Sequence, residues 1–122
     1  MAEGFKKLRI WQNGYELLMK IYKITTDFPD LEKYALVQQI IKSANSIIAN
    51  IAESHGRFYY LDKIRVLYIS RGEAAETQSH LTVAHGQGYI NEEKHKELIN
   101  EYENLIININ NHINDLKSKS KK

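Results

Sequence analysis

The stretch QQIIKSANSIIANIAESHGR, from Gln38 to Arg57, decides the fold. An apolar series recurs through it every three or four residues and continues into a histidine: Val37, Ile41, Ala44, Ile48, Ile51 and His55. That spacing marks one face of an α-helix, since a strand repeats every two residues. Gly56 follows the series, and glycine suits the left-handed position that closes a helix. The stretch therefore predicts an amphipathic helix that ends at Gly56.

Three further stripes with helical spacing flank this segment. They consist of Leu8, Trp11, Tyr15, Leu18 and Tyr22; of Leu61, Ile64, Tyr68, Ala75 and Leu81; and of Leu98, Tyr102, Leu105, Ile109, His112 and Leu116. Each stripe indicates a helix whose marked residues face a shared core.

Short breaks separate the four helices. DFPD at 27–30 contains Pro29 and a potential capping Asp, GQGY covers 86–89, and Asn91 suits the start of the last helix. Short connections make consecutive helices antiparallel neighbours. We predict an all-α chain with an antiparallel up-down-up-down four-helix bundle over residues 1–116. The Lys/Ser-rich segment 117–122 is predicted to be a basic disordered tail.

The composition limits the classes of function. The 122 residues suit one domain, and the absence of Cys excludes disulfides and thiolate metal sites. No apolar run reaches the length of a membrane span, and the N-terminal segment lacks the apolar core of a signal peptide. We therefore expect a cytoplasmic protein without membrane contact.

Motifs of catalysis do not occur in the sequence. Neither G-x-S-x-G nor GxxxxGK[ST] is present. Glu92 and His95 form one Glu-x-x-His pair, whereas a di-iron bundle needs two such pairs and two further Glu residues. We predict no catalytic site, no metal and no cofactor, so the chain is not expected to be an enzyme.

Basic residues concentrate in the middle of the chain. Five Lys and Arg face two acids between Lys42 and Arg71, whereas five Glu face two Lys between Asn91 and Glu103. This pattern predicts one basic and one acidic surface, or else two ordinary solvated faces. The candidate nucleic-acid contacts are Lys42, Arg57, Lys63, Arg65 and Arg71, with Lys6, Lys7 and Arg9 as a second patch.

The aromatic run Phe58-Tyr59-Tyr60 lies between Arg57 and Lys63. Aromatic side chains interleaved with cations can stack bases and hold phosphates. The alternative is a hydrophobic staple at the entrance of the next helix, which suits Tyr60 better.

A second face of the helix before Gly56 has small, weakly polar side chains. Small residues allow close approach of another backbone, so we infer that this face contacts another subunit; an ordinary exposed helix with Ala chosen for its propensity is the alternative. The candidate interface residues are Asn45, Ala49, Asn50, Ala52 and Glu53.

The ordered motifs resemble a known family. They are FKKLRIWQNGYELLMKIY at 5–22, DFP at 27–29, the opening stretch at 38–57, LYISRGEAAETQSHL at 67–81 and GYI at 88–90. Together they resemble the bacterial proteins encoded by 23S rRNA intervening sequences. The accessory variability determinants of diversity-generating retroelements have the same fold.

The resemblance implies a small non-enzymatic protein that forms a barrel-like homopentamer. For the retroelement branch it implies binding to RNA and to a reverse transcriptase. Two hypotheses follow. The chain is an oligomeric accessory protein that binds structured RNA, or DNA, or it is a protein-interaction scaffold without nucleic acid.

Overall fold

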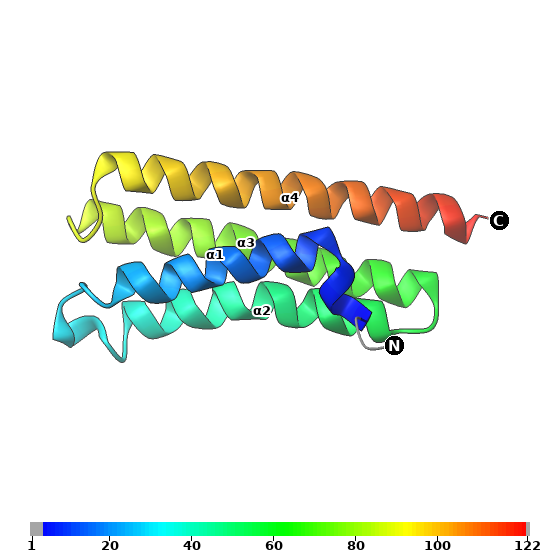
Figure 1. Cartoon of the computed structure of the whole chain (residues 1–122), viewed down its shortest axis with the longest axis horizontal. Helices are drawn as coiled ribbons and strands as arrows, with labels where there is room; N and C mark the ends of the chain where they lie inside the picture. Colours follow the sequence, from blue (N-terminus) through cyan, green and yellow to red (C-terminus); the bar gives the residue numbers. More distant parts are fainter. Residues whose placement is uncertain (1–3, 122) are drawn as a thin grey trace.

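Four antiparallel helices run up, down, up and down in the computed structural model, which describes residues 4–121 (Figure 1). They are α1 (Arg9–Thr25), α2 (Leu36–Gly56), α3 (Tyr60–Gly86) and α4 (Glu92–Ser120), with short 3-10 turns η1 (Gly4–Lys7) and η2 (Asp30–Glu32). α3 packs most heavily against α2 and α4, while α1 contacts α2 more than α4. The predicted all-α four-helix bundle is confirmed.

Two helix ends have the capping chemistry that the sequence predicts. Asn91 caps α4, since its Oδ1 accepts the backbone N–H of Lys94 at 2.7 Å. Within GQGY, Gly88 has a φ of +81°, and the N–H of Tyr89 donates to the carbonyl oxygen of Ala84 at 2.9 Å. The left-handed Gly88 and this hydrogen bond together end α3 and reverse the chain.

Two other predicted end signals are wrong in detail. Gly56 is the last residue of α2 but lacks a positive φ, and the chain leaves the helix through an extended Arg57. Asp30 begins η2, and α2 starts only at Leu36 after Ala35, without a side-chain cap. The Pro29 break therefore inserts an extra turn between the two helices.

The predicted core stripes match the structure best on α4 and least well on α1. On α4, Leu98, Tyr102, Leu105, Ile109 and Leu116 are buried as predicted, with Ile113 in place of the half-buried His112. On α1 the buried stripe is shifted by one residue, to Ile10, Gly14, Leu17, Leu18, Ile21 and Thr25. Tyr15 and Tyr22 are exposed, contrary to the prediction.

The other two stripes are partly wrong. On α3, Ile64 and Leu81 are buried as predicted, whereas Leu61, Tyr68 and Ala75 are exposed. Leu67 and Ala74 are buried in addition. On α2, His55 is exposed and Ile40 and Ile47 are buried in addition to the predicted Ala44, Ile48 and Ile51. α3 contacts two neighbours, so its buried face is wider than a single 3-4 stripe.

Small residues set the spacing between the helices. A Cβ on Gly14 would lie 2.5 Å from Cγ2 of Ile48 and 3.7 Å from Cδ2 of Leu105. Ser43 and Thr77 share a hydroxyl hydrogen bond of 2.8 Å between α2 and α3. Close approach at these points places the helix axes where larger side chains would not fit.

The C-terminal segment is more ordered than the sequence predicts. α4 continues from Glu92 to Ser120, so most of the predicted disordered tail is helical. Asp115 and Lys119 form an i,i+4 ion pair with a distance of 3.2 Å. Residues 1–3, included in the predicted bundle, and residue 122, included in the predicted tail, lie outside the described residues.

Candidate nucleic-acid interface

A cross-section near the middle divides the bundle into two halves. Gly14 faces Ile48 and Leu105 there, and the hydroxyl of Ser70 donates to the carbonyl oxygen of Ile47 at 2.7 Å. Residues 4–14, 47–71 and 106–121 lie on one side, at the end where both termini and the α2–α3 turn meet (Figure 1). Residues 15–46 and 72–105 lie on the other side.

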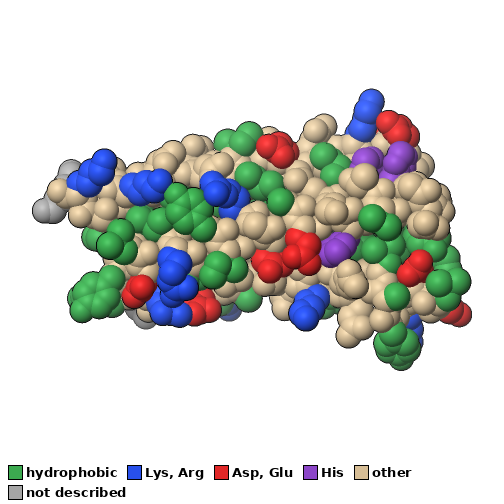
Figure 2. Space-filling model, turned by 180° about the vertical axis from the view of Figure 1, so that it is seen from behind, with side chains coloured by type: hydrophobic (Ala, Val, Ile, Leu, Met, Phe, Trp, Pro, Cys, Tyr) green, Lys and Arg blue, Asp and Glu red, His purple; other side chains and the backbone are tan. Residues whose placement is uncertain are grey.

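These two halves have opposite formal charge. The first, called the basic half below, has ten Lys and Arg and three acids, a net charge of +7. The second, the acidic half, has six Lys and Arg and eleven acids, a net charge of −5. Figure 2 shows Lys and Arg side chains gathered over the end at its left, with hydrophobic side chains between them. The predicted charge asymmetry is therefore present, but it runs along the bundle and does not divide it into two faces.

Seven of the eight predicted nucleic-acid contacts lie in the basic half: Lys6, Lys7, Arg9, Arg57, Lys63, Arg65 and Arg71. The fold thus brings the two predicted patches to the same end. Lys42 is the exception, since it lies in the acidic half and lines a depression with Glu73 and Glu76. Burial raises the pKa of Glu73 and Glu76 adds to this, while Lys42 partly offsets the shift.

Three of the seven residues have structural partners, and two of them, Arg57 and Lys63, lie at the α2–α3 turn. Arg57 Nη2 lies 2.5 Å from Oε2 of Glu53, in an i,i+4 pair. The hydrogen bond that the Arg57 guanidinium donates to Glu53 raises its pKa. Lys63 Nζ donates to the carbonyl oxygen of His55 at 2.8 Å, at the end of α2. Each still has an exposed flank, but part of its charge is compensated.

Arg71 belongs to a cluster that the sequence did not indicate. Its Nη1 donates to Oδ1 of Asn110 at 2.6 Å, and its Cζ lies 4.7 Å from the ring centre of Tyr68. Lys117 Nζ lies 5.5 Å from the same ring. A hydrogen bond from Lys117 lowers the pKa of Tyr68, and the charges of Lys117 and Arg71 add to that lowering. Tyr68 thus holds two cations on the surface of α3 and α4.

Lys117 was missed because it was assigned to a disordered tail. It follows Leu116, which keeps the 3-4 spacing of the α4 core stripe, and this spacing was the available signal that the helix continues. Tyr68 was missed because it was assigned to the core.

Four of the predicted cations are exposed without side-chain partners within residues 4–121: Lys6, Lys7, Arg9 and Arg65. Exposed, uncompensated cations lose little on approaching a phosphate and release its counterions when they do so. These four side chains are therefore the best placed to contact a nucleic acid.

The predicted interface residues lie along one side of α2. Asn45 and Ala49 are exposed, and Ala52 is half-buried. Asn50 turns its amide nitrogen back to the carbonyl oxygen of Ser46 at 2.9 Å, while Glu53 pairs with Arg57. Their role in an interface stays a prediction.

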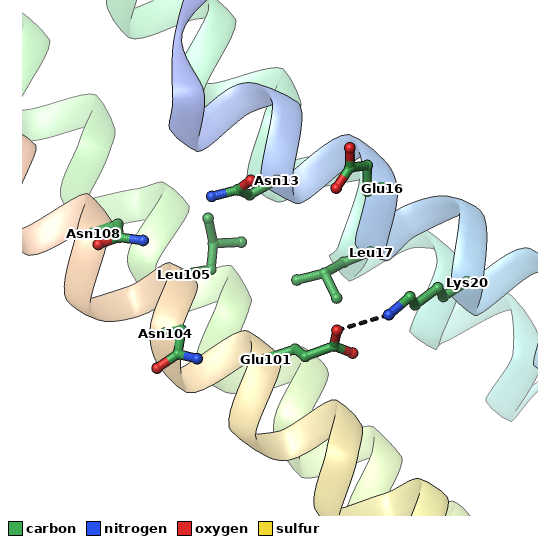
Figure 3. A pocket seen from close by; sticks show the side chains of 8 residues that line it. All are labelled: Asn13, Glu16, Leu17, Lys20, Glu101, Asn104, Leu105 and Asn108. Carbon is green, nitrogen blue, oxygen red and sulfur yellow. Dashed lines mark hydrogen bonds and ion pairs between the residues drawn. The ribbon is translucent and has the colours of Figure 1, made fainter.

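A groove of about 180 Å³ lies between α1 and α4 (Figure 3). Asparagine side chains line it, with an ion pair of 2.7 Å from Lys20 Nζ to Oε2 of Glu101. The hydrogen bond that Lys20 donates to Glu101 raises the pKa of Lys20. Within residues 4–121 no group of three or more His, Asp or Glu side chains is arranged to hold a metal ion.

A model of the family described as 23S rRNA-intervening sequence protein matches residues 6–111. The chain belongs to this family. The match spans all four helices, and the predicted family resemblance is confirmed.

A solved structure supports membership of the 23S rRNA-intervening sequence protein family. The crystal structure of a protein of unknown function from the S23 ribosomal protein family of Bacteroides thetaiotaomicron has a TM-score of 0.76 with this chain and 25% sequence identity. The alignment covers 85% of this chain and 97% of that chain. No curated protein matches the chain. None of the helices in the described part combines the length and apolar character of a bilayer-spanning segment.

Proposed function

We propose that this family member is a non-enzymatic accessory protein that forms a homo-oligomer and binds structured RNA through its basic half. The separation of charge, +7 in one half and −5 in the other, carries the proposal. Affinity for a polyanion rises with the number of phosphates that cations neutralise. The family resemblance implies a pentamer, and a ring of parallel subunits would gather the basic halves on one rim.

Self-association is assigned to the side formed by α1 and α2. Tyr15 and Tyr22 of α1 expose 43% and 47% of their surface, and Met19 exposes 41%. Tyr22 lines a groove with Ile41 of α2, and the predicted interface residue Asn45 lies one helical turn further along. Exposed apolar groups that gather on one side are typical of a contact surface.

Charge reversal at two exposed positions tests the RNA contact. Arg9→Glu/Arg65→Glu changes the net charge from +2 to −2. For each phosphate that the variant no longer neutralises, the slope of log affinity against log salt should become shallower by about 0.7 for single-stranded segments. We expect filter binding with a structured RNA to show weaker affinity and a shallower salt slope for this variant.

The matched control is Lys23→Glu/Lys96→Glu, which gives the same net charge through exposed positions of the acidic half. This control should retain most of the affinity. Equal decreases in affinity for both variants would show that only net charge matters, and a flat salt response of the unmodified protein would refute RNA binding through cations. Light scattering on the same samples measures the oligomer; a monomer at all concentrations would contradict the assembly.

A second candidate function is a protein-interaction scaffold without nucleic acid, with a reverse transcriptase as the partner that the retroelement branch implies. The exposed apolar side of α1 and α2 favours it. Binding through such a surface would persist at high salt, since salt screens charges and not apolar burial. RNA binding that depends on Arg9 and Arg65 would argue against a scaffold alone.

A further inference from the structure

We propose that Phe58 and Tyr59, at the tip of the α2–α3 turn, stack on unpaired bases of the bound RNA. This inference rests on the proposed function and specifies which RNA is bound: one with single-stranded nucleotides beside its structured parts. The two rings expose 85% and 67% of their surface and lie 4.9 Å apart in an edge-to-face pair. They are the most exposed aromatic groups of the basic half.

Hydrogen bonds fix the backbone of the turn that carries these rings. The hydroxyl of Ser54 donates to the carbonyl oxygen of Lys63 at 2.8 Å, and Lys63 Nζ returns to the carbonyl oxygens of His55 and Ser54 at 2.8 and 3.4 Å. The end of α2 and the start of α3 are thus tied together on both sides of the rings. Because the backbone is already fixed, mainly side-chain freedom is lost when a base stacks on either ring.

The surroundings favour a polyanion with bases. The hydrophobic-staple alternative explains neither ring, since side chains that pack against a helix start would be covered. Arg65, Arg71 and Lys117 continue from the turn along the side of α3 and α4. The helical rise separates Tyr60 from Arg71 by about 16 Å, so a strand could stack at the tip and place its phosphates along the side.

A lipid surface is the competing partner, since aromatic groups and cations also bind anionic membranes. A planar surface would reach the tip of the bundle, but not the cations along its side. The extended arrangement of the cationic groups therefore fits a nucleic-acid strand better.

The test compares a fluorescent single-stranded RNA with a blunt duplex of the same length, by fluorescence anisotropy. Stacking on one aromatic side chain changes affinity by about five- to 140-fold. Phe58→Ala/Tyr59→Ala should weaken single-strand binding by about tenfold or more and leave duplex binding unchanged. The salt slope should stay the same, because no charge is removed.

Two further variants sharpen the comparison. Tyr34→Ala removes an aromatic side chain that is 80% exposed in the acidic half, and it should change neither affinity. Phe58→Trp/Tyr59→Trp should keep single-strand affinity, since an indole stacks at least as well. Circular dichroism should show unchanged helix content in all of these variants, because the substituted groups are on the surface.

The outcomes separate this inference from the proposed function. If the unmodified protein binds both RNAs and the double Ala variant is unchanged, stacking is refuted and RNA binding stands. An equal decrease in affinity for duplex and single strand also refutes stacking. If the unmodified protein binds neither RNA, the proposed function fails. If Phe58→Ala/Tyr59→Ala no longer binds phosphatidylserine vesicles that the unmodified protein binds, and its RNA binding is unchanged, stacking is refuted and the rings are assigned to a lipid surface.

Discussion

Gly14→Ala offers a quantitative test of how α1 packs on α2. The added Cβ would lie 2.5 Å from Cγ2 of Ile48, well inside normal contact distance. Ile48 is β-branched and lies within a helix, so its Cγ2 has little freedom to rotate away. Overpacking of this kind costs about 1–3 kcal/mol. Alanine also stabilises a helix interior by up to about 1 kcal/mol relative to glycine, which hides part of that cost.

Gly72→Ala is the matched control for the helix propensity. Gly72 lies inside α3, and a Cβ there would have no neighbour within 4 Å. The control should therefore be more stable than the unmodified protein by roughly 0.4–1 kcal/mol. Subtracting one variant from the other removes the contribution of helix propensity, so Gly14→Ala should be less stable than Gly72→Ala by about 1–3 kcal/mol.

Urea unfolding followed by helical circular dichroism measures the difference at one fixed protein concentration, because oligomer formation couples to stability. Adding Ile48→Leu to Gly14→Ala should recover stability, since leucine has no methyl branch at Cβ and a similar volume. Equal stabilities of Gly14→Ala and Gly72→Ala would refute the close approach of the two helices.

Two other predictions concern the core and its response to pH. Ser70→Ala removes the hydrogen bond to the Ile47 carbonyl and should destabilise by about 1 kcal/mol in the same urea assay, while exposed Ser79→Ala should change stability little. Burial lowers the pKa of His112; Asp115 opposes this, and Lys119, His55 and Lys63 add to it. As the pH falls, the unfolded chain therefore takes up a proton at this histidine before the folded chain does. The stability that depends on neutral His112 is fully present above about pH 6.5 and is lost as the pH falls below it. The urea midpoint should fall less on acidification for His112→Gln than for the unmodified protein; parallel curves would rule out His112 as the cause.

The fold could be predicted from the sequence because three of its signals agree. The stripe on α4, the Gly88 turn and the Asn91 cap all indicate the same topology, and each rests on local chemistry. Local signals of this kind do not show which residues of α1 are buried. Two apolar series lie one residue apart there, one through Gly14 and one through Tyr15. The series through Gly14 is the buried one, because the close approach to Ile48 leaves no room for a larger side chain.

The basic half could have been predicted in part. An up-down-up-down bundle always brings the start of its first helix, its second turn and the end of its last helix to one end. The prediction from the sequence nevertheless kept Lys6–Arg9 apart from Arg57–Arg71, and it treated Lys117 as disordered. The pairing of Tyr68 with Arg71 and Lys117 depends on how α3 and α4 pack, which no local pattern reports.

Helix dipoles do not explain why the charges separate. The basic half contains the N-terminal ends of α1 and α3 and the C-terminal ends of α2 and α4, so its four dipoles largely cancel. Arg9 even lies at the start of α1, where the dipole disfavours a cation. Ten cations with three acids in one half must also repel one another. Capping by Lys63 and the ion pairs of Arg57 and Lys119 account for part of this arrangement. They leave Lys6, Lys7, Arg9 and Arg65 unexplained, whereas a polyanion bound at that end would turn the repulsion into attraction.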